Sequence, residues 1–428
     1  MFKKIVVILI IISSMLLIIA CESDSLPDQY NLNIQSEGKG HVDLNPELNK
    51  YPKGTTIKLT AKPVDNWEFT HWSGDINTYE NPYKLEINKE TNIKAIFSPN
   101  SNFLPGKGDS NEPYEIYHAE HLSLIGQEDY PLNSHYKLIN DIDMEGIEFT
   151  PIETFQGVFD GKGFAINNLY INMPDDDNIG LFSINEGSIK NLQLNNAEIN
   201  GNRNVGTIAG INEGVISNIT VKADVSGESR VGGLVGSNVE SSIISNSSAN
   251  INIYATGLYT PEVHTPHSTA AGLVATNLGI IEKSFAKGKV TATDLLYVGG
   301  LVGCNYRYHP DHIVYIFDSY ASVNVSGNNY VGGLVGSHLG IEIKNSYATG
   351  KVQGSGDIGG LIARSGSNSI VNNSYWDTET TRQESSAAGE GKERSEMQSK
   401  STYEDWDFDN IWAIDEGEDY PYLQWEEK

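Results

Sequence analysis

The chain is poor in cysteine, methionine and basic side chains, and each shortage narrows the classes of protein to which it can belong. Only two of its 428 residues are cysteines, so a fold held together by several disulfides is excluded. Lys and Arg number 29 against 56 Asp and Glu, which gives a formal net charge of −27. Because so acidic a surface repels nucleic acid, we expect no nucleic-acid partner.

Glycine and tyrosine are the abundant residues. There are 42 glycines and 22 tyrosines against five methionines, a balance that suits strands and turns better than packed helices. Charged residues make up 20% of the chain and hydrophobic ones 39%, which is typical of a folded protein. The composition therefore favours an all-β protein.

One long apolar run lies at the start of the chain. Lys3 and Lys4 precede an almost unbroken apolar stretch over residues 5–20, which is shorter than the roughly 20 residues of a membrane span. The run ends in Ile-Ile-Ala-Cys, which resembles the lipobox of bacterial lipoproteins. That resemblance implies a signal peptide over 1–20, cleavage before Cys21 and a diacylglyceryl group on its sulfur. An uncleaved signal anchor is the alternative.

The other cysteine, Cys304, has no intramolecular partner if Cys21 carries lipid. It occupies the serine position of a repeated octet, so we expect a small buried side chain there and no nucleophile. Residues 21–29 are polar and are predicted to form a tether.

Residues 30–98 alternate polar and apolar side chains in short runs such as TTIKLTA and NIKAIF, the pattern of half-buried antiparallel strands. The segment, and WEFTHWSG at Trp67–Gly74 above all, resembles the divergent internalin-type B-repeat of bacterial surface proteins. That resemblance implies a spacer module of β-grasp-like character. Trp72 is expected to pack in its core, with ligand stacking as the alternative.

An octet, VGGLVGSN at Val231–Asn238, recurs along the chain in degenerate form. Its copies begin at Asn178, Val205, Val231, Ala270, Val298, Val331 and Ile358. A phosphate-binding loop occurs once and ends in Lys followed by Ser or Thr, and no copy here does so. The octet is therefore a structural repeat and not a nucleotide site.

Two further elements follow each octet, one typified by EIKNSYAT and a weaker one typified by GKVTAT. Three short strands in about 26 residues without a helix is the composition of one coil of a parallel β-helix. The sequence thus predicts an all-β fold: a right-handed parallel β-helix (solenoid) preceded by the small β module. The second element is expected to stack polar side chains as an asparagine ladder. These are Asn191, Asn218, Asn246, Asp318, Asn345 and Asn373.

The octet followed by I-x-N-S-Y-A-T-G-x-V, as in Gly332–Val352, resembles the GLUG motif of bacterial surface and adhesin-like proteins. The preceding segment, from GKGDSNEPYEIYHAEHLSLIG onward, resembles the capping start of the same proteins. We therefore assign residues 99–375 to a GLUG-repeat β-helix with an N-terminal cap. Residues 376–428 are acidic and rich in tryptophan, and they are predicted to form a C-terminal cap, with a carbohydrate-stacking platform as the alternative.

Candidates for chemistry are few. Glycosidic cleavage needs two carboxylates on one face, for which Asp141, Asp143 and Glu145 are candidates, although turn roles are favoured. A loop with Asp175, Asp176 and Asp177 is a weak calcium candidate. We assign no catalytic residue, no metal and no cofactor.

Two insertions lengthen the coils, over residues 254–268 and 306–312, and loops that project from a rigid solenoid often carry binding residues. The candidate ligand-binding residues are Tyr254, Tyr259, Tyr306 and Tyr308. Loops packed against their own coil are the alternative.

These observations predict a non-catalytic, adhesin-like scaffold in the cell envelope, lipid-anchored and exposed outside the cytoplasm, at the cell surface or outer membrane. Its expected partners are the membrane, through the lipid, and an extracellular glycan or a host or matrix protein. One alternative is a β-helix polysaccharide lyase or glycoside hydrolase. The other is a purely structural envelope protein.

Overall fold

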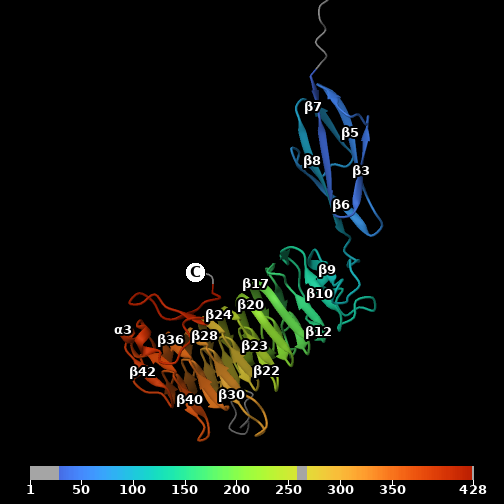
Figure 1. Ribbon diagram of the computed structural model, residues 1–428. Helices are drawn as coiled ribbons and strands as arrows, with labels where there is room; N and C mark the ends of the chain where they lie inside the picture. The colour runs from blue at the N-terminus through green and yellow to red at the C-terminus, as the bar shows by residue number, and fades with distance from the viewer. Residues whose placement is uncertain (1–27, 258–267, 427–428) are drawn as a thin grey trace, which may run out of the picture. The chain divides into compact units, whose positions relative to one another are not determined.

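The structure of the protein is a computed structural model that describes residues 28–257 and 268–426 (Figure 1). The chain divides between residues 100 and 101 into two compact units, each with its own sheets. Each unit is built from strands that alternate buried and exposed side chains, as the sequence pattern predicts.

The first unit consists of two three-stranded sheets and a short two-stranded pair. Its strands are β1 (Gln29–Tyr30), β2 (Leu32–Glu37), β3 (Gly40–Asn45), β4 (Tyr51–Pro52), β5 (Thr55–Pro63), β6 (Trp67–Gly74), β7 (Tyr83–Ile87) and β8 (Thr91–Pro99). Strand β2 pairs parallel with β8, whereas the other pairings are antiparallel. Trp72 is fully buried, and its indole N–H donates to the carbonyl of Glu80 over 3.0 Å. The core role predicted for this tryptophan is thus confirmed.

The second unit is a parallel β-helix in which every coil contributes strands to stacked parallel sheets (Figure 1). One eight-stranded sheet contains the second half of each octet. Its strands are β12 (Ile152–Phe155), β16 (Phe182–Asn185), β19 (Ala209–Asn212), β22 (Val235–Asn238), β26 (Val274–Asn277), β30 (Val302–Tyr306), β34 (Val335–Leu339) and β39 (Ile362–Ser365). A six-stranded sheet contains the first residues of the octets and the residues just before them, ahead of the corner formed by the paired glycines. Its strands are β18 (Arg203–Val205), β21 (Ser229–Gly232), β25 (Thr269–Ala271), β29 (Tyr297–Gly299), β33 (Tyr330–Gly332) and β38 (Ile358–Gly359).

The remaining strands form a wide sheet that bends once per coil into a short-strand wall and a long-strand wall. The short-strand wall contains the first parts of β17 (Ser188–Asn200) and β20 (Val215–Gly227), together with β9 (Tyr114–Ile116), β10 (His135–Leu138), β13 (Val158–Asp160), β23 (Ile243–Ser245), β27 (Ile280–Glu282), β31 (Tyr315–Phe317), β35 (Glu342–Lys344) and β40 (Ile370–Asn372). The long-strand wall contains the second parts of β17 and β20, together with β11 (Ile142–Asp143), β14 (Ala165–Asn167), β15 (Tyr170–Asn172), β24 (Ser248–Ala255), β28 (Phe285–Ala292), β32 (Tyr320–Ser326), β36 (Tyr347–Thr349), β37 (Val352–Gln353), β41 (Tyr375–Asp377) and β42 (Glu390–Lys392). Short helix α1 (Ala119–Leu122) lies at the N-terminal end.

The octet glycines are required by close approach of neighbouring coils. The second glycine of the octet corner stacks on its counterparts as Gly233, Gly272, Gly300, Gly333 and Gly360. A Cβ on any of the first four would lie closer than 3.0 Å to the carbonyl oxygen of the next glycine. The octet is therefore a corner in which backbone packs on backbone, as the sequence predicts.

A continuous ladder of buried amides runs through the last position of the octets. It comprises Asn185, Asn212, Asn238, Asn277 and Asn305 and ends at His338, all 0% exposed. Each side-chain amide donates to the carbonyl oxygen of the next asparagine over 2.7–2.8 Å. Because both ends of each amide find a partner, five coils are linked without an unsatisfied side-chain group in this column.

The asparagine ladder predicted in the second element is interrupted. The corner residues there have left-handed φ values between 44° and 56°, which asparagine tolerates well. Their amides link only Asp160 to Asn191 to Asn218, and Asp318 to Asn345, and one break falls where Lys283 takes the position between Asn246 and Asp318.

The serines that follow these corners compensate for the interruption. The hydroxyl oxygens of Ser284, Ser319, Ser346 and Ser374 accept a backbone N–H from the preceding coil's serine over 3.2–3.3 Å. Each of these hydroxyls also donates to the carbonyl two residues before it, over 2.6–2.9 Å. In the Asn-Ser pair of the repeat, the first residue thus adopts the left-handed conformation of the corner. The serine that follows it forms the hydrogen bonds between neighbouring coils.

His338 replaces asparagine at the end of the octet ladder and makes the fold sensitive to acid. Its Nδ1 lies 3.0 Å from the Asn305 amide nitrogen and its Nε2 lies 3.2 Å from the carbonyl oxygen of Ile370. Nδ1 therefore accepts and Nε2–H donates, which is the neutral imidazole. Burial lowers the pKa of His338 from 6.5 to about 4.

Because the folded state holds His338 neutral while the unfolded chain protonates it near pH 6.5, this group favours folding fully above pH 6.5. That stability is lost as the pH falls from 6.5 to about 4, and amounts to about 3 kcal/mol. His338→Asn should remove this part of the pH dependence. The free energy of unfolding, measured by denaturant titration at pH 7.5 and pH 4.5, checks it. His41→Asn, at an exposed site on β3, is the control and should leave the dependence unchanged. An equal pH dependence for His338→Asn and the native chain would contradict the prediction.

The C-terminal segment does more than close the end of the solenoid. Trp376 packs in the core beneath the last glycine corner, but the other tryptophans after it lie along the side of the coils. There Trp406, Trp412 and Leu423 are buried against a stack formed by Phe285, Tyr320, Tyr347 and Tyr375. The segment contains α2 (Thr378–Thr381), α3 (Arg394–Met397), a 3-10 turn (Lys400–Thr402), β43 (Trp412–Ala413) and β44 (Tyr422–Leu423).

Three tryptophan N–H groups fix this segment to the left-handed corners of three coils. Trp425 donates to the carbonyl of Lys283 over 2.9 Å, Trp412 to the Asp318 carboxylate over 3.2 Å, and Trp406 to the carbonyl of Asn373 over 3.0 Å. These indoles are occupied by packing and hydrogen bonding, which supports the predicted structural role over the alternative of an open carbohydrate-stacking platform.

Candidate functional site

The outer face of the long-strand wall is the candidate site, and we call it the long-wall face. Alternate residues of β17, β20, β24, β28 and β32 point inward as Ala, Ile or Val, and the residues between them point outward. The outward positions are almost all polar. The face is therefore a flat polar surface supported by a close-packed core.

Strand register aligns these outward residues in columns that run from coil to coil. The central column reads Glu198, Asp224, Asn252, Lys289 and Asn324, each opposite the next in the parallel pairing. A second column reads Lys222, Asn250, Lys287, Ser322 and Thr349. A third reads Asn200, Ser226, Tyr254, Thr291 and Ser326. Since neighbouring strands lie about 4.8 Å apart, each column offers a regularly spaced row of hydrogen-bonding groups.

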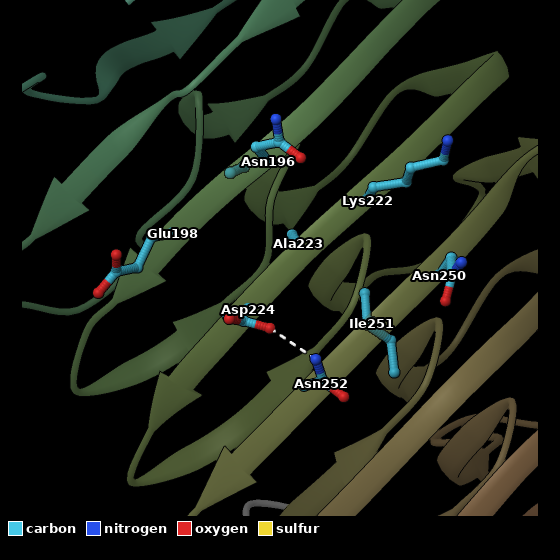
Figure 2. Close-up of a pocket in the computed structure, with 9 residues that line it drawn as sticks. Asn196, Glu198, Lys222, Ala223, Asp224, Asn250, Ile251 and Asn252 are labelled. Carbon is cyan, nitrogen blue, oxygen red and sulfur yellow. Dashed lines mark hydrogen bonds between the residues drawn. The ribbon is translucent and has the colours of Figure 1, made fainter. Parts of the chain in front are cut away.

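Three shallow hollows are found on this face. The first lies around Lys222, Asp224 and Asn250, and Figure 2 shows these side chains standing on neighbouring strands. The second adjoins it and reaches Tyr254 and Lys289. The third lies further along the solenoid, where the C-terminal segment meets β32 and β36. All three follow the same face and suit an extended ligand better than a small compact one.

Charged groups of both signs lie along the long-wall face. Glu198 and Asp224 are adjacent carboxylates near its first coils, and Asp224 accepts a hydrogen bond from the Asn252 amide over 2.8 Å. Lys222 lies on the same strand as Asp224, and Lys287 and Lys289 follow on β28. Lys287 is paired with Glu426 over 3.1 Å, while Lys289 has no ion pair among the described residues. The face thus carries its carboxylate pair near one end and lysines from there onward.

The structure does not gather the predicted tyrosines into one patch. Tyr254 lies on the long-wall face and is 56% exposed. Tyr306 and Tyr308 lie at the opposite turn of their coil, after β30, with ring centroids 6.2 Å apart. Tyr259 lies outside the described residues. The prediction of these four as ligand-binding residues stays a prediction, and the four-ring patch is reduced to one pair and one separate ring.

The other predicted candidates are scattered. Asp175, Asp176 and Asp177 lie on an exposed turn, and no group of three or more His, Cys, Asp or Glu in the described part of the chain is arranged to hold a metal ion. Asp143 accepts from the Glu145 backbone and the Asn168 amide, which is the turn role expected for it. Cys304 is fully buried, and burial raises the pKa of its thiol to about 12, so it is no nucleophile. Cys21 lies outside the described residues.

Sequence reasoning missed the residues of the long-wall face, which belong to the weak third element of the repeat. That element was recognised as a strand in KADVSG and GKVTAT, but its polar positions were given no role. The signal is the strict alternation of this element. In KADVSG, the alanine, valine and glycine face the core, whereas the lysine, aspartate and serine face outward. Only the register shows that they form columns.

Family comparisons agree with the two kinds of repeat. Residues 30–101 match the family model of the divergent InlB B-repeat domain. Residues 227–254 and 327–353 each match the GLUG motif, and both spans lead from one coil through an octet into the next long strand. Both resemblances inferred from the sequence are thereby confirmed.

Two relatives extend the comparison. Halomucin of Haloquadratum walsbyi is 36% identical over 165 residues, which cover 34% of this chain and 2% of halomucin. A protein of Evansella cellulosilytica named "Putative Gly-rich membrane protein" is 30% identical over 431 residues, which cover 75% of this chain and 45% of that protein. The chain thus spans less than half the length of either relative. In the described residues, no helix is both long and apolar enough to cross a membrane.

Two solved structures are similar in fold. One, from Bacteroides ovatus, is of a "putative immunoglobulin A1 protease", with a TM-score of 0.49, 21% identity and coverage of 75% of this chain and 95% of that one. The other, "IgA1 Protease", has a TM-score of 0.41 and 17% identity over 80% of this chain and 27% of that one. At these values the likeness supports no conclusion about activity. The chain thus contains two matches to the GLUG motif within a parallel β-helix and, before it in the sequence, a match to the divergent InlB B-repeat domain.

Proposed function

We propose that this protein is a lipid-anchored scaffold of the cell envelope whose long-wall face binds an extended extracellular glycan without cleaving it. The observation that carries the proposal is the long-wall face itself: columns of amides, hydroxyls and charged groups repeated once per coil, with three hollows along them. A polymer with a repeating unit can meet such a row several times, and several weak contacts add to a useful affinity.

The rigid core supports this role. Binding residues on stacked strands lose little conformational freedom when a ligand arrives, because the backbone of each strand is already hydrogen-bonded to a neighbouring strand on both sides. Polar side chains are also the groups that hydrogen-bond sugar hydroxyls, and Tyr254 offers an exposed ring beside them. The relative named as a membrane protein is compatible with an envelope location.

The glycan proposal is tested with the full chain, purified in mild detergent, on a panel of polysaccharides. We expect retention of at least one polymer on native affinity gels and no release of reducing ends. Asp224→Asn together with Asn252→Asp swaps the two partners of one hydrogen bond and should change retention by a few-fold while thermal stability stays constant. Absence of retention across neutral, acidic and basic polymers would refute the proposal.

A second function is favoured by one specific observation, the adjacent carboxylates Glu198 and Asp224. They lie opposite each other on β17 and β20, and paired carboxylates a few ångströms apart are the machinery of glycoside hydrolysis. Release of oligosaccharides that is lost in both Glu198→Gln and Asp224→Asn would establish a hydrolase in place of a binding scaffold.

The lipid anchor is proposed from the lipobox-like sequence before Cys21. We expect the native chain to incorporate labelled fatty acid and to sediment with membranes in a bacterial host. Cys21→Ser should abolish the label because the acceptor sulfur is gone, with Cys304→Ser as the matched control that keeps it. Equal labelling of Cys21→Ser and the native chain would rule the anchor out.

A further inference from the structure

We propose that the hollow between the C-terminal segment and the long-wall face is a binding site for an anionic sugar unit, one bearing a carboxylate or sulfate group. This inference rests on the proposed glycan-binding function and names the ligand class at one place on the face. The hollow has a volume of about 580 Å³ and lies over β32 and β36. Its lining combines Lys351, Arg382 and Arg394 with neutral polar groups and one tyrosine.

The charge of the hollow is opposite to that of the protein. The chain carries a net charge of −27, yet this lining holds three cations against a single carboxylate, Glu379. Among the described residues, neither Lys351 nor Arg382 has a carboxylate within ion-pair distance. Glu379 is engaged with the protein, since its Oε1 accepts the backbone N–H of Arg394 over 3.3 Å. Two cations are thus left to an incoming anion.

The third cation, Arg394, is held in place by a chain of groups that ends at a buried carboxylate. The Tyr420 hydroxyl donates to the carboxylate of Asp377, whose side chain is 0% exposed, and accepts from Arg394 Nε over 3.2 Å. Burial, followed by the neighbouring Asp377 charge, raises the pKa of Tyr420 to about 12, so this hydroxyl keeps its proton at neutral pH. A guanidinium fixed through Nε binds an anion with less loss of conformational freedom than a free one.

The remaining lining suits a sugar better than a bare inorganic anion. Ser322, Asn324 and Thr349 stand on the long-wall face and Thr380 on the facing segment. Hydroxyl and amide groups pair with sugar hydroxyls, while guanidinium and ammonium groups pair with a carboxylate or sulfate. Ser322 and Thr349 occupy one column of the face and Asn324 the next, so the hollow continues the rows that the proposed glycan follows.

The C-terminal segment makes this site. Without residues 379–420 the last coils would offer Lys351 alone among these cations, because Arg382 and Arg394 both follow β41. The lateral packing of the segment, fixed by its tryptophans, therefore brings two arginines to the part of the wall where Lys351 lies.

The test is affinity electrophoresis of the full chain in mild detergent with polygalacturonate, dextran sulfate and neutral dextran. We expect at least one of the anionic polymers to bind at least about tenfold more tightly than neutral dextran, and this preference to fall as salt is raised. Tighter binding of polygalacturonate would identify carboxylate as the recognised group, and tighter binding of dextran sulfate would identify sulfate.

The variant pair is Lys351→Gln with Arg382→Gln, compared with Lys58→Gln with Lys84→Gln, which removes the same charge from exposed positions of β5 and β7, outside the long-wall face. We expect the first pair to lose about tenfold in affinity for the anionic polymer and the second to lose about twofold or less. Thermal stability of both pairs should match the native chain, because none of the four cations is in an ion pair among the described residues.

Native affinity in the first pair, or equal binding of dextran and the anionic polymers, overturns this site. If neutral dextran binds the native chain as tightly as the anionic polymers do, the site is wrong while the proposed function stands. If no polymer binds the native chain, both fail together.

Discussion

Replacing Gly300 by valine should cost about 4–5 kcal/mol of folding free energy, a loss far outside the usual range for a single substitution. Gly300 stands in the middle of the stacked corners, and a Cβ there would overlap the Gly333 carbonyl oxygen and approach the Ala321 methyl to 2.9 Å. The obstacle on one side is backbone that is itself paired with the next coil. The clash therefore cannot be relieved by a rotamer change and must separate two coils.

The measurement is the midpoint of thermal unfolding, followed by far-UV circular dichroism and by tryptophan fluorescence. The fluorescence reports mainly the C-terminal segment, where Trp376, Trp406, Trp412 and Trp425 lie, and also the first unit, which holds Trp67 and Trp72. Ser322→Val, an exposed strand position on β32, is the control and should change stability by about 0.5 kcal/mol or less. A Gly300→Val chain as stable as this control would show that the corner is looser than the backbone contacts require.

The repeats allowed most of the fold to be predicted because each coil repeats one local rule. Glycine corners, alternating strands and Asn-Ser turns recur at fixed order, so several degenerate copies determined the solenoid where a single copy such as AAGLVATN could not. The same regularity made the buried core of Leu234, Val235 and their counterparts predictable.

The continuous ladder was harder to predict because two asparagine columns look alike in the sequence. Position eight of the octet and the corner of the second element are both rich in asparagine, and the second was chosen as the ladder. The structure favours the first, since Asn238 is fully buried whereas Asn218 is exposed. Burial depends on how the eight-stranded sheet meets the short-strand wall, which no single coil encodes.

The candidate site was beyond sequence reasoning for a related reason. Lys351 lies in the last repeats, whereas Arg394 lies in the acidic segment 376–428, whose composition indicated only a cap. Their approach depends on that segment turning back along the side of the solenoid, where aromatic rings from four coils offer it a surface. The aromatic residues of the second element were visible in SFA, SYA and SYW, but their shared lateral column was not.

Asn277→Leu should cost about 4 kcal/mol, because it breaks the buried ladder at two points while keeping the number and branching of the side-chain heavy atoms. The Asn238 amide would lose its acceptor and the Asn305 carbonyl oxygen would lose its donor, at sites with no access to water. Each such orphaned group costs about 1–3 kcal/mol. The turn bonds from Asn277 to Gly279, at 3.1 and 3.2 Å, would be lost as well.

Thermal and denaturant unfolding of Asn277→Leu measure this loss, and Asn250→Leu, the same change at an exposed position of β24, should cost about 0.5 kcal/mol or less. Pairing Asn277→Leu with Asn238→Leu tests the cause. Asn277→Leu leaves an orphaned amide at Asn238, and Asn238→Leu leaves an orphaned carbonyl oxygen at Asn277. The double variant removes both groups, so its cost should be well below the sum of the two single costs. Strict additivity would mean that the amides stabilise their own turns separately and that the ladder between coils contributes nothing.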